Sequence, residues 1–135
     1  MTELDAARAI CDRFVANWNL ADGRFALDNE AFDPDEAPGD PWLRLSVKHF
    51  ARALETMGPP NRRWRAVGSI FVQVFVPRDS GTTLAHQLAQ KVRVIFEGRE
   101  VSGVKCYQSS TRELGIDGPW WVALVETAFD YDEQR

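Results

Sequence analysis

The chain has 135 residues, of which 44% are apolar and 11% aromatic, a composition that excludes a disordered protein and suits one domain with a sizeable core. Its net charge is −4, which does not favour a protein that binds nucleic acid over its whole surface. No apolar run approaches the ~20 residues that span a bilayer, and the charged amino-terminal stretch lacks the apolar region of a signal peptide. We therefore expect a single domain over residues 1–135.

The first third of the chain predicts one helix followed by a long loop. Apolar residues repeat at intervals of three and four over residues 3–18, as Leu4, Ala7, Cys11, Phe14 and Trp18. Thr2 and Asp5 stand where a capping pair begins a helix. The prolines and acids of residues 19–41 then predict a Pro-rich acidic loop or arm, with a short strand around residues 25–27.

The middle third predicts a strand hairpin and a second helix. From Trp42, an apolar residue alternates with a polar one, which is typical of a strand with one wet face; the apolar set is Leu43, Leu45, Val47 and Ala51. Residues 58–61 turn the chain, and a partner strand runs from Trp64 through Val76 until Pro77, which has no N–H to donate, ends it. A helix over about 83–96 is predicted by the stripe Leu84, Leu88, Val92 and Ile95, and Gly98 closes it.

The last third predicts a second hairpin, with strands at about 101–113 and 119–131 joined through residues 115–118. The order of helix, hairpin, helix and hairpin indicates an α+β fold. We expect an antiparallel sheet of two hairpins, with about four main strands and a short one. The two amphipathic helices should pack mainly on one face of it.

Two predicted strands are apolar on both faces. In residues 68–77 the even positions from Ile70 to Val76 suit the core, while Phe71 and Phe75 point the other way; in the final strand Trp120 and Val122 do the same. Two helices can cover only one face of the sheet completely, and a wet patch of this size usually marks an interface. The sequence therefore predicts an interface at Phe71, Phe75, Trp120 and Val122. The alternative is that the 19–41 loop folds over them.

Charge is unevenly distributed. Residues 28–40 hold acids and no base, namely Asp28, Glu30, Asp33, Asp35, Glu36 and Asp40. Residues 44–65 hold one acid, Glu55, against the bases Arg44, Lys48, Arg52, Arg62, Arg63 and Arg65. One interpretation is two solvated loops. The other is that the acidic segment of one copy faces the basic segment of the next, with contacts between Asp33, Asp35 or Glu36 and Arg62, Arg63 or Arg65.

No group of residues predicts catalysis. His49 and His86 have no acid or base partner at a readable spacing, and Cys11 and Cys106 lack the spacing of metal ligands, so we expect reduced thiols. The sequence contains no nucleophile elbow, dinucleotide fingerprint or triad order. We expect a protein that is not an enzyme and has no metal or cofactor. The run Arg-Arg-Trp-Arg at 62–65 mixes charge with an aromatic and leaves a small nucleic-acid-binding module as an alternative.

Several segments, taken in order, resemble the phage tail terminator family of lambda-like long-tailed phages, also described as tail completion proteins. The most telling segment is Val-Gln-Val-Phe-Val-Pro at 72–77, preceded by Gly68 and followed by Gly81 and a Leu-rich helix that ends at Phe96. The resemblance also includes the amino-terminal helix, Pro-Trp-Leu-Arg at 41–44, Asp-Gly-Pro-Trp-Trp at 117–121 and Phe-Asp-Tyr at 129–131. Residues 29–32 read Asn-Glu-Ala-Phe where some members have Asn-x-Pro-Phe.

This resemblance implies a virion structural protein of a phage or prophage. It implies a homo-oligomeric ring, usually a hexamer, that caps the head-proximal end of the tail tube, ends polymerisation of the tube and joins tail to head. The implied partners are further copies of the chain, the major tail tube protein and head–tail connector proteins. The implied locations are the host cytoplasm during assembly and then the virion tail. A head–tail connector adaptor of the same machinery is the alternative.

Overall fold

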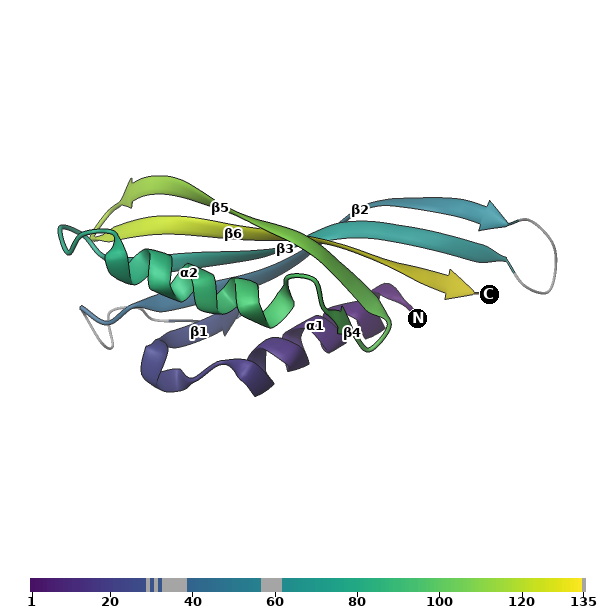
Figure 1. The fold of residues 1–135 in the computed structure, drawn as a ribbon, viewed down its shortest axis with the longest axis horizontal. Helices are drawn as coiled ribbons and strands as arrows, with labels where there is room; N and C mark the ends of the chain where they lie inside the picture. Colours follow the sequence, from purple (N-terminus) through teal and green to yellow (C-terminus); the bar gives the residue numbers. More distant parts are fainter. Residues whose placement is uncertain (29, 31, 33–38, 57–61, 135) are drawn as a thin grey trace.

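The computed structural model describes residues 1–28, 30, 32, 39–56 and 62–134. The elements in these residues are α1 (Glu3–Asn17), the short 3-10 helix η1 (Leu20–Asp22), β1 (Arg24–Leu27), β2 (Trp42–Thr56), β3 (Arg63–Pro77), α2 (Thr83–Phe96), β4 (Glu100–Val101), β5 (Val104–Asp117) and β6 (Trp120–Gln134). The strands form one curled sheet in the order β1-β2-β3-β6-β5-β4, shown in Figure 1. The α+β class predicted from the sequence is confirmed.

The sheet has six strands where about five were expected, and it is mixed. The hairpins β2–β3 and β5–β6 meet through β3 and β6, and every pair is antiparallel except β1 with β2, which is parallel. The strand β4 was not predicted because two residues are too short to show a period. Ser102 and Gly103, both with positive φ, form the two-residue turn that joins β4 to β5.

The last hairpin turns later than the sequence predicts. Strand β5 continues to Asp117, and Gly118 and Pro119 make the turn. Gly115, which we placed in the turn, has a φ of 90° and lies at a register shift between β5 and β6. A β-bulge is a common place for such a glycine, so the positive φ bends the strand without ending it.

The core lies between the two helices and one face of the sheet. Helix α1 begins with the predicted capping box, because the Thr2 hydroxyl accepts a hydrogen bond from the Asp5 N–H and the Asp5 carboxylate accepts one from the Thr2 N–H. The hydrogen bond from the Thr2 N–H to the Asp5 carboxylate lowers the pKa of Asp5. The stripe predicted on α1 is rotated by one residue: Ala6, Ile10 and Phe14 are buried, whereas Leu4 is 58% exposed.

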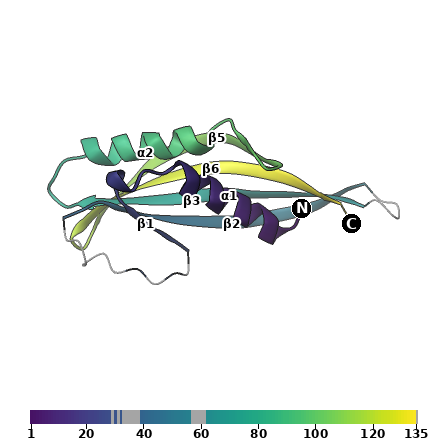
Figure 2. The same cartoon turned by 90° about the horizontal axis from the view of Figure 1, so that it is seen from below.

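Both helices lie on the same side of the sheet. Helix α2 packs along β3 and β6, and α1 lies beside α2 towards β2 (Figure 1). Figure 2 shows α2 along one side of the sheet, and residues of both helices pack in the core on that side; no helix of the described residues packs on the opposite side, which we call the outer face. The β2–β3 hairpin and the end of β6 project beyond both helices as an arm (Figure 1). The sheet therefore presents a large helix-free surface and a projecting three-stranded end.

Candidate interaction surfaces

The outer face carries a second apolar cluster where β2 begins and β3 ends. Its buried members are Trp42, Phe75, Trp120 and Val122, each at most 8% exposed. Phe32 stacks on Trp42 with 4.8 Å between ring centroids, and Trp42 stacks on Phe75 at 3.9 Å. The guanidinium of Arg24 lies 4.8 Å from the Phe32 ring and extends the stack.

This stack corrects the expectation that Phe75, Trp120 and Val122 are uncovered in a single chain. Phe32 belongs to the 19–41 segment, so the alternative weighed from the sequence applies at this end of the sheet. Trp42 was placed at the start of a strand but not in this cluster. Its β-register partner is Phe75, and the cross-strand pair puts both rings on the outer face. An interface role for these residues stays a prediction.

Phe71 occupies a different position, near the middle of the outer face. It is partly buried and meets Phe50 edge to face, with 6.2 Å between ring centroids. Phe50 is 62% exposed, and Val67, on the same face of β3, is 37% exposed. We call Phe50, Val67 and Phe71 the outer patch. Only Phe71 of these three was predicted for the contact surface, and Phe50 and Val67 are the more exposed members.

The sequence pattern did not identify Phe50 as a residue of the outer face, because β2 contains a β-bulge at this position. The register between β2 and β3 shifts between His49 and Ala51, so Phe50 is the extra residue. The bulge moves Ala51 off the core face, where strict alternation had placed it, and it is exposed. A sequence pattern with period two cannot show where one strand gains a residue.

The basic hairpin is engaged within its own chain. Arg65 donates from Nε to the Asp130 carboxylate at 2.9 Å, and Arg63 donates to Asp132 at 2.5 Å. The hydrogen bonds to these carboxylates raise the pKa values of both arginines. Arg52 pairs with Glu133. Three acids at the end of β6, Asp130, Asp132 and Glu133, therefore connect this strand to β2 and β3 in the arm.

The structure describes only some of the residues in the predicted contact between the acidic and basic segments. Asp33, Asp35 and Glu36 lie outside the described residues. At the edge of the acidic segment, Asp28 accepts a 3.1 Å ion pair from Lys48 of the same chain. Arg62 is exposed, and no partner for its side chain lies in the described part of the chain. Of the three predicted arginines, Arg62 is thus the one still available to a neighbour.

Both histidines have side-chain partners within the chain, and both cysteines are free thiols. His49 Nε2 lies 2.8 Å from the Tyr131 hydroxyl, and His86 Nε2 lies 3.1 Å from Glu113. Both partners are distant in sequence, so no spacing could reveal them. Cys106 is buried and its burial raises the thiol pKa to about 11. Among the described residues, no three potential metal ligands come together.

The comparisons with known proteins give the family. A sequence profile described as phage tail terminator protein matches residues 5–126, which include most of α1 and all elements up to the first half of β6. The chain belongs to the phage tail terminator family. Members of this family are structural proteins of the phage tail, so the resemblance seen in the sequence is confirmed. The acids Asp130, Asp132 and Glu133 lie beyond the matched residues.

Solved structures share the fold. One of 28 matching chains aligns with a TM-score of 0.68 over 97% of the terminator chain and 96% of its own length, at 19% sequence identity. This likeness shows the fold alone. No curated protein matches the sequence. Within the described residues, no helix of the terminator is both long and apolar enough to cross a membrane.

Proposed function

We propose that this terminator is a non-enzymatic protein that forms a homo-oligomeric ring, of six copies by analogy with its family, on the head-proximal end of a tail tube. The ring ends polymerisation of the tube and provides the surface that joins the tail to the head. Family membership supports the place in the tail. The observation that carries the ring is the outer patch, because Phe50 remains 62% exposed beside Phe71 at the middle of a face that no helix covers.

The shape of the subunit suits a ring built from unlike surfaces. A heterologous contact, in which one surface meets a different surface of the next copy, closes into a ring when the rotation per copy allows it. The chain offers the outer patch on one face of the sheet and the helical layer on the other. The arm extends beyond the helices (Figure 1). The partners proposed are further copies, the major tail tube protein and a head-side connector. Assembly takes place in the host cytoplasm.

The experiment compares the native chain with Phe50→Ser/Phe71→Ser. We expect the native protein to sediment as a ring at high concentration, or to bind the ends of purified tail tubes in electron micrographs. The double variant should remain monomeric and leave the tube ends bare, since burial of a large aromatic side chain contributes about 1.5–3 kcal/mol. Leu4→Ser is the matched control, because Leu4 is 58% exposed but lies on α1.

Two results would count against the proposal. One is a native protein that stays monomeric at every concentration and does not bind tail tubes. The other is binding to capsid portals without any binding to tubes, which would place the chain among head–tail connector adaptors instead. Assembly of the double variant as efficient as that of the native chain would leave the ring possible but remove the outer patch from its interface.

A further inference from the structure

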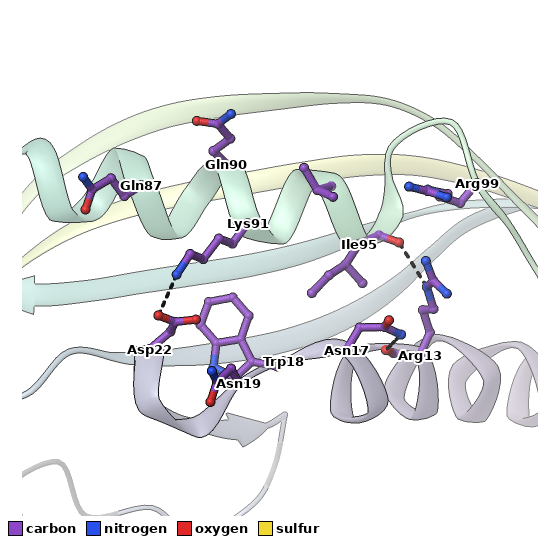
Figure 3. Close-up of a pocket in the computed structure, with 11 residues that line it drawn as sticks. Arg13, Asn17, Trp18, Asn19, Asp22, Gln87, Gln90, Lys91, Ile95 and Arg99 are labelled. Carbon is purple, nitrogen blue, oxygen red and sulfur yellow. Dashed lines mark hydrogen bonds and ion pairs between the residues drawn. The ribbon is translucent and has the colours of Figure 1, made fainter.

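The two helices border an open groove, lined mainly by polar and charged residues, on the side of the molecule opposite the outer patch. Its volume is about 790 Å³, within the range of sites that hold small ligands or short peptide segments. The carboxyl end of α1, the residues after it and the last residue of η1 form one wall, and α2 with Arg99 forms the other (Figure 3). We call this the α1–α2 groove. None of the residues predicted from the sequence for the interface lines this groove.

The groove is positively charged although the protein is negative overall. Its lining contains three cations, Arg13, Lys91 and Arg99, against one acid, Asp22, which gives a net charge of +2 in a chain of −4. Asp22 pairs with Lys91 at 2.6 Å. This pair lies at one end of the groove, and the two arginines lie at the other (Figure 3).

The two arginines keep donors for a ligand. Arg13 uses Nε to donate to the Ile95 carbonyl oxygen at 3.2 Å, which orients its guanidinium between the helices. Arg99 is exposed, and its guanidinium has no ion-pair or hydrogen-bond partner among the described residues. Guanidinium groups bind carboxylates through paired N–H donors, so this end is suited to a carboxylate.

Apart from its charged groups, the groove has a lining that suits a peptide. Four carboxamides, Asn17, Asn19, Gln87 and Gln90, line the groove. Carboxamides both donate and accept hydrogen bonds, which is what an extended polypeptide backbone requires. Val94, which is 59% exposed, adds an apolar contact.

We propose that the α1–α2 groove binds an acidic polypeptide segment of another protein of the assembly. The carboxylates of that segment would pair with Arg13 and Arg99, and its backbone would bond to the carboxamides. The features of the groove favour a peptide over single-stranded nucleic acid. Its one aromatic lining residue, Trp18, is only 7% exposed and stacks on Phe14, so it offers no open ring on which a base can stack.

The test is a titration of the isotopically labelled full-length chain, followed by NMR, with a short blocked peptide of alternating glutamate and serine. We expect shifts at the backbone amides of residues 13–22 and 87–99, and none with the matching glutamine and serine peptide. Arg99→Gln should weaken binding about tenfold, and higher salt should weaken it as well. Arg8→Gln is the matched control, because Arg8 is an exposed arginine on α1 that does not line the groove.

A second variant makes the groove more positive, whereas Arg99→Gln makes it less positive. Asp22→Asn removes the acid of the groove and releases Lys91, so we expect about threefold tighter binding of the same peptide. The proposal is overturned if neither peptide produces shifts. It is also overturned if an oligothymidine shifts the same amides more strongly, or if Arg99→Gln abolishes self-association while the peptide has no effect. The titrations are carried out at protein concentrations below those at which the chain sediments as a ring, so their outcome does not depend on the ring.

Discussion

At the scale of single residues, small steric and electrostatic features decide what the terminator tolerates. Gly68 lies on β3 opposite His49 and Phe129, in the middle of the sheet. A Cβ added there would lie 2.6 Å from Cζ of Phe129 and closer still to the carbonyl oxygen of Lys48. Gly68 is therefore required by close packing and not by its own backbone angles.

Replacement of Gly68 by alanine tests this packing. We expect Gly68→Ala to lower the free energy of unfolding by about 1–3 kcal/mol, because the Phe129 ring and the β2 backbone must both move. Urea denaturation followed by tryptophan fluorescence measures the change. Ser110→Ala, at an exposed position on β5, is the control and should change stability little. An unaltered midpoint for Gly68→Ala would show that the sheet relaxes freely at this point.

Burial of the Cys106 thiol should make the free energy of unfolding depend on pH in the alkaline range. Burial raises the pKa of its thiol from 9.0 to about 11, so the folded chain keeps a proton that the unfolded chain loses. The stabilisation is fully present below pH 9 and is lost as pH rises to about 11, by an amount on the order of 2 kcal/mol. Under reducing conditions, unfolding free energies measured across this range should fall more steeply for the native chain than for Cys106→Ala. Parallel curves would contradict the expectation.

At the scale of elements, ion pairs hold the end of β6 onto the projecting arm. Glu133 is largely buried and pairs with Arg52, whose guanidinium also lies 5.6 Å from the Trp64 ring and 3.9 Å from Glu3. Beyond the helices the strands have little apolar cover, so these charges take the place of a core. The arm should therefore loosen locally when a charge is removed, without unfolding of the domain.

Glu133→Gln tests the attachment of the arm. We expect hydrogen exchange at the amides of residues 64–66 and 130–133 to accelerate about tenfold, because the Arg52 charge loses its closest carboxylate. Amides of residues 70–76, under α2, should keep their rates. Glu113→Gln is the matched control, since Glu113 pairs with His86 at an exposed site. Equal exchange in both variants would show that backbone pairing alone holds β6.

At the scale of the whole molecule, the fold separates three surfaces. The outer patch lies on the helix-free face, the α1–α2 groove lies on the helical side, and the arm carries the basic hairpin. Because Arg63 and Arg65 already pair with Asp132 and Asp130, reversal of all three hairpin arginines would disturb the arm itself. A charge contact between copies is better tested at Arg62.

Arg62→Glu separates assembly from stability. If the hairpin of one copy faces an acidic segment of the next, the variant should require about tenfold more protein to form rings, and added salt should weaken the native ring in the same direction. The unfolding midpoint of the monomer should not change. Sedimentation at two salt concentrations measures both effects. Rings that form equally well would assign the hairpin to the tube, to the head or to solvent.

The sequence alone determined the α+β class, the two helices, the long strands and the family. These follow from local chemistry: periodicity separates helix from strand, the pair Thr2 and Asp5 caps α1, and Pro77 ends a ladder for lack of an N–H. The positions of the helices and long strands can therefore be predicted from short stretches of sequence.

Only the tertiary structure decided which apolar and charged groups remain available. Phe75 is buried because Phe32 and Trp42 cover it, Phe50 is exposed because a bulge shifts its register, and Arg65 is neutralised by an acid 65 residues away. Each result depends on groups that are distant in sequence and on the register of paired strands. A pattern read along the chain contains neither, which is why it could not distinguish the buried Phe75 from the partly exposed Phe71 on the same face of β3.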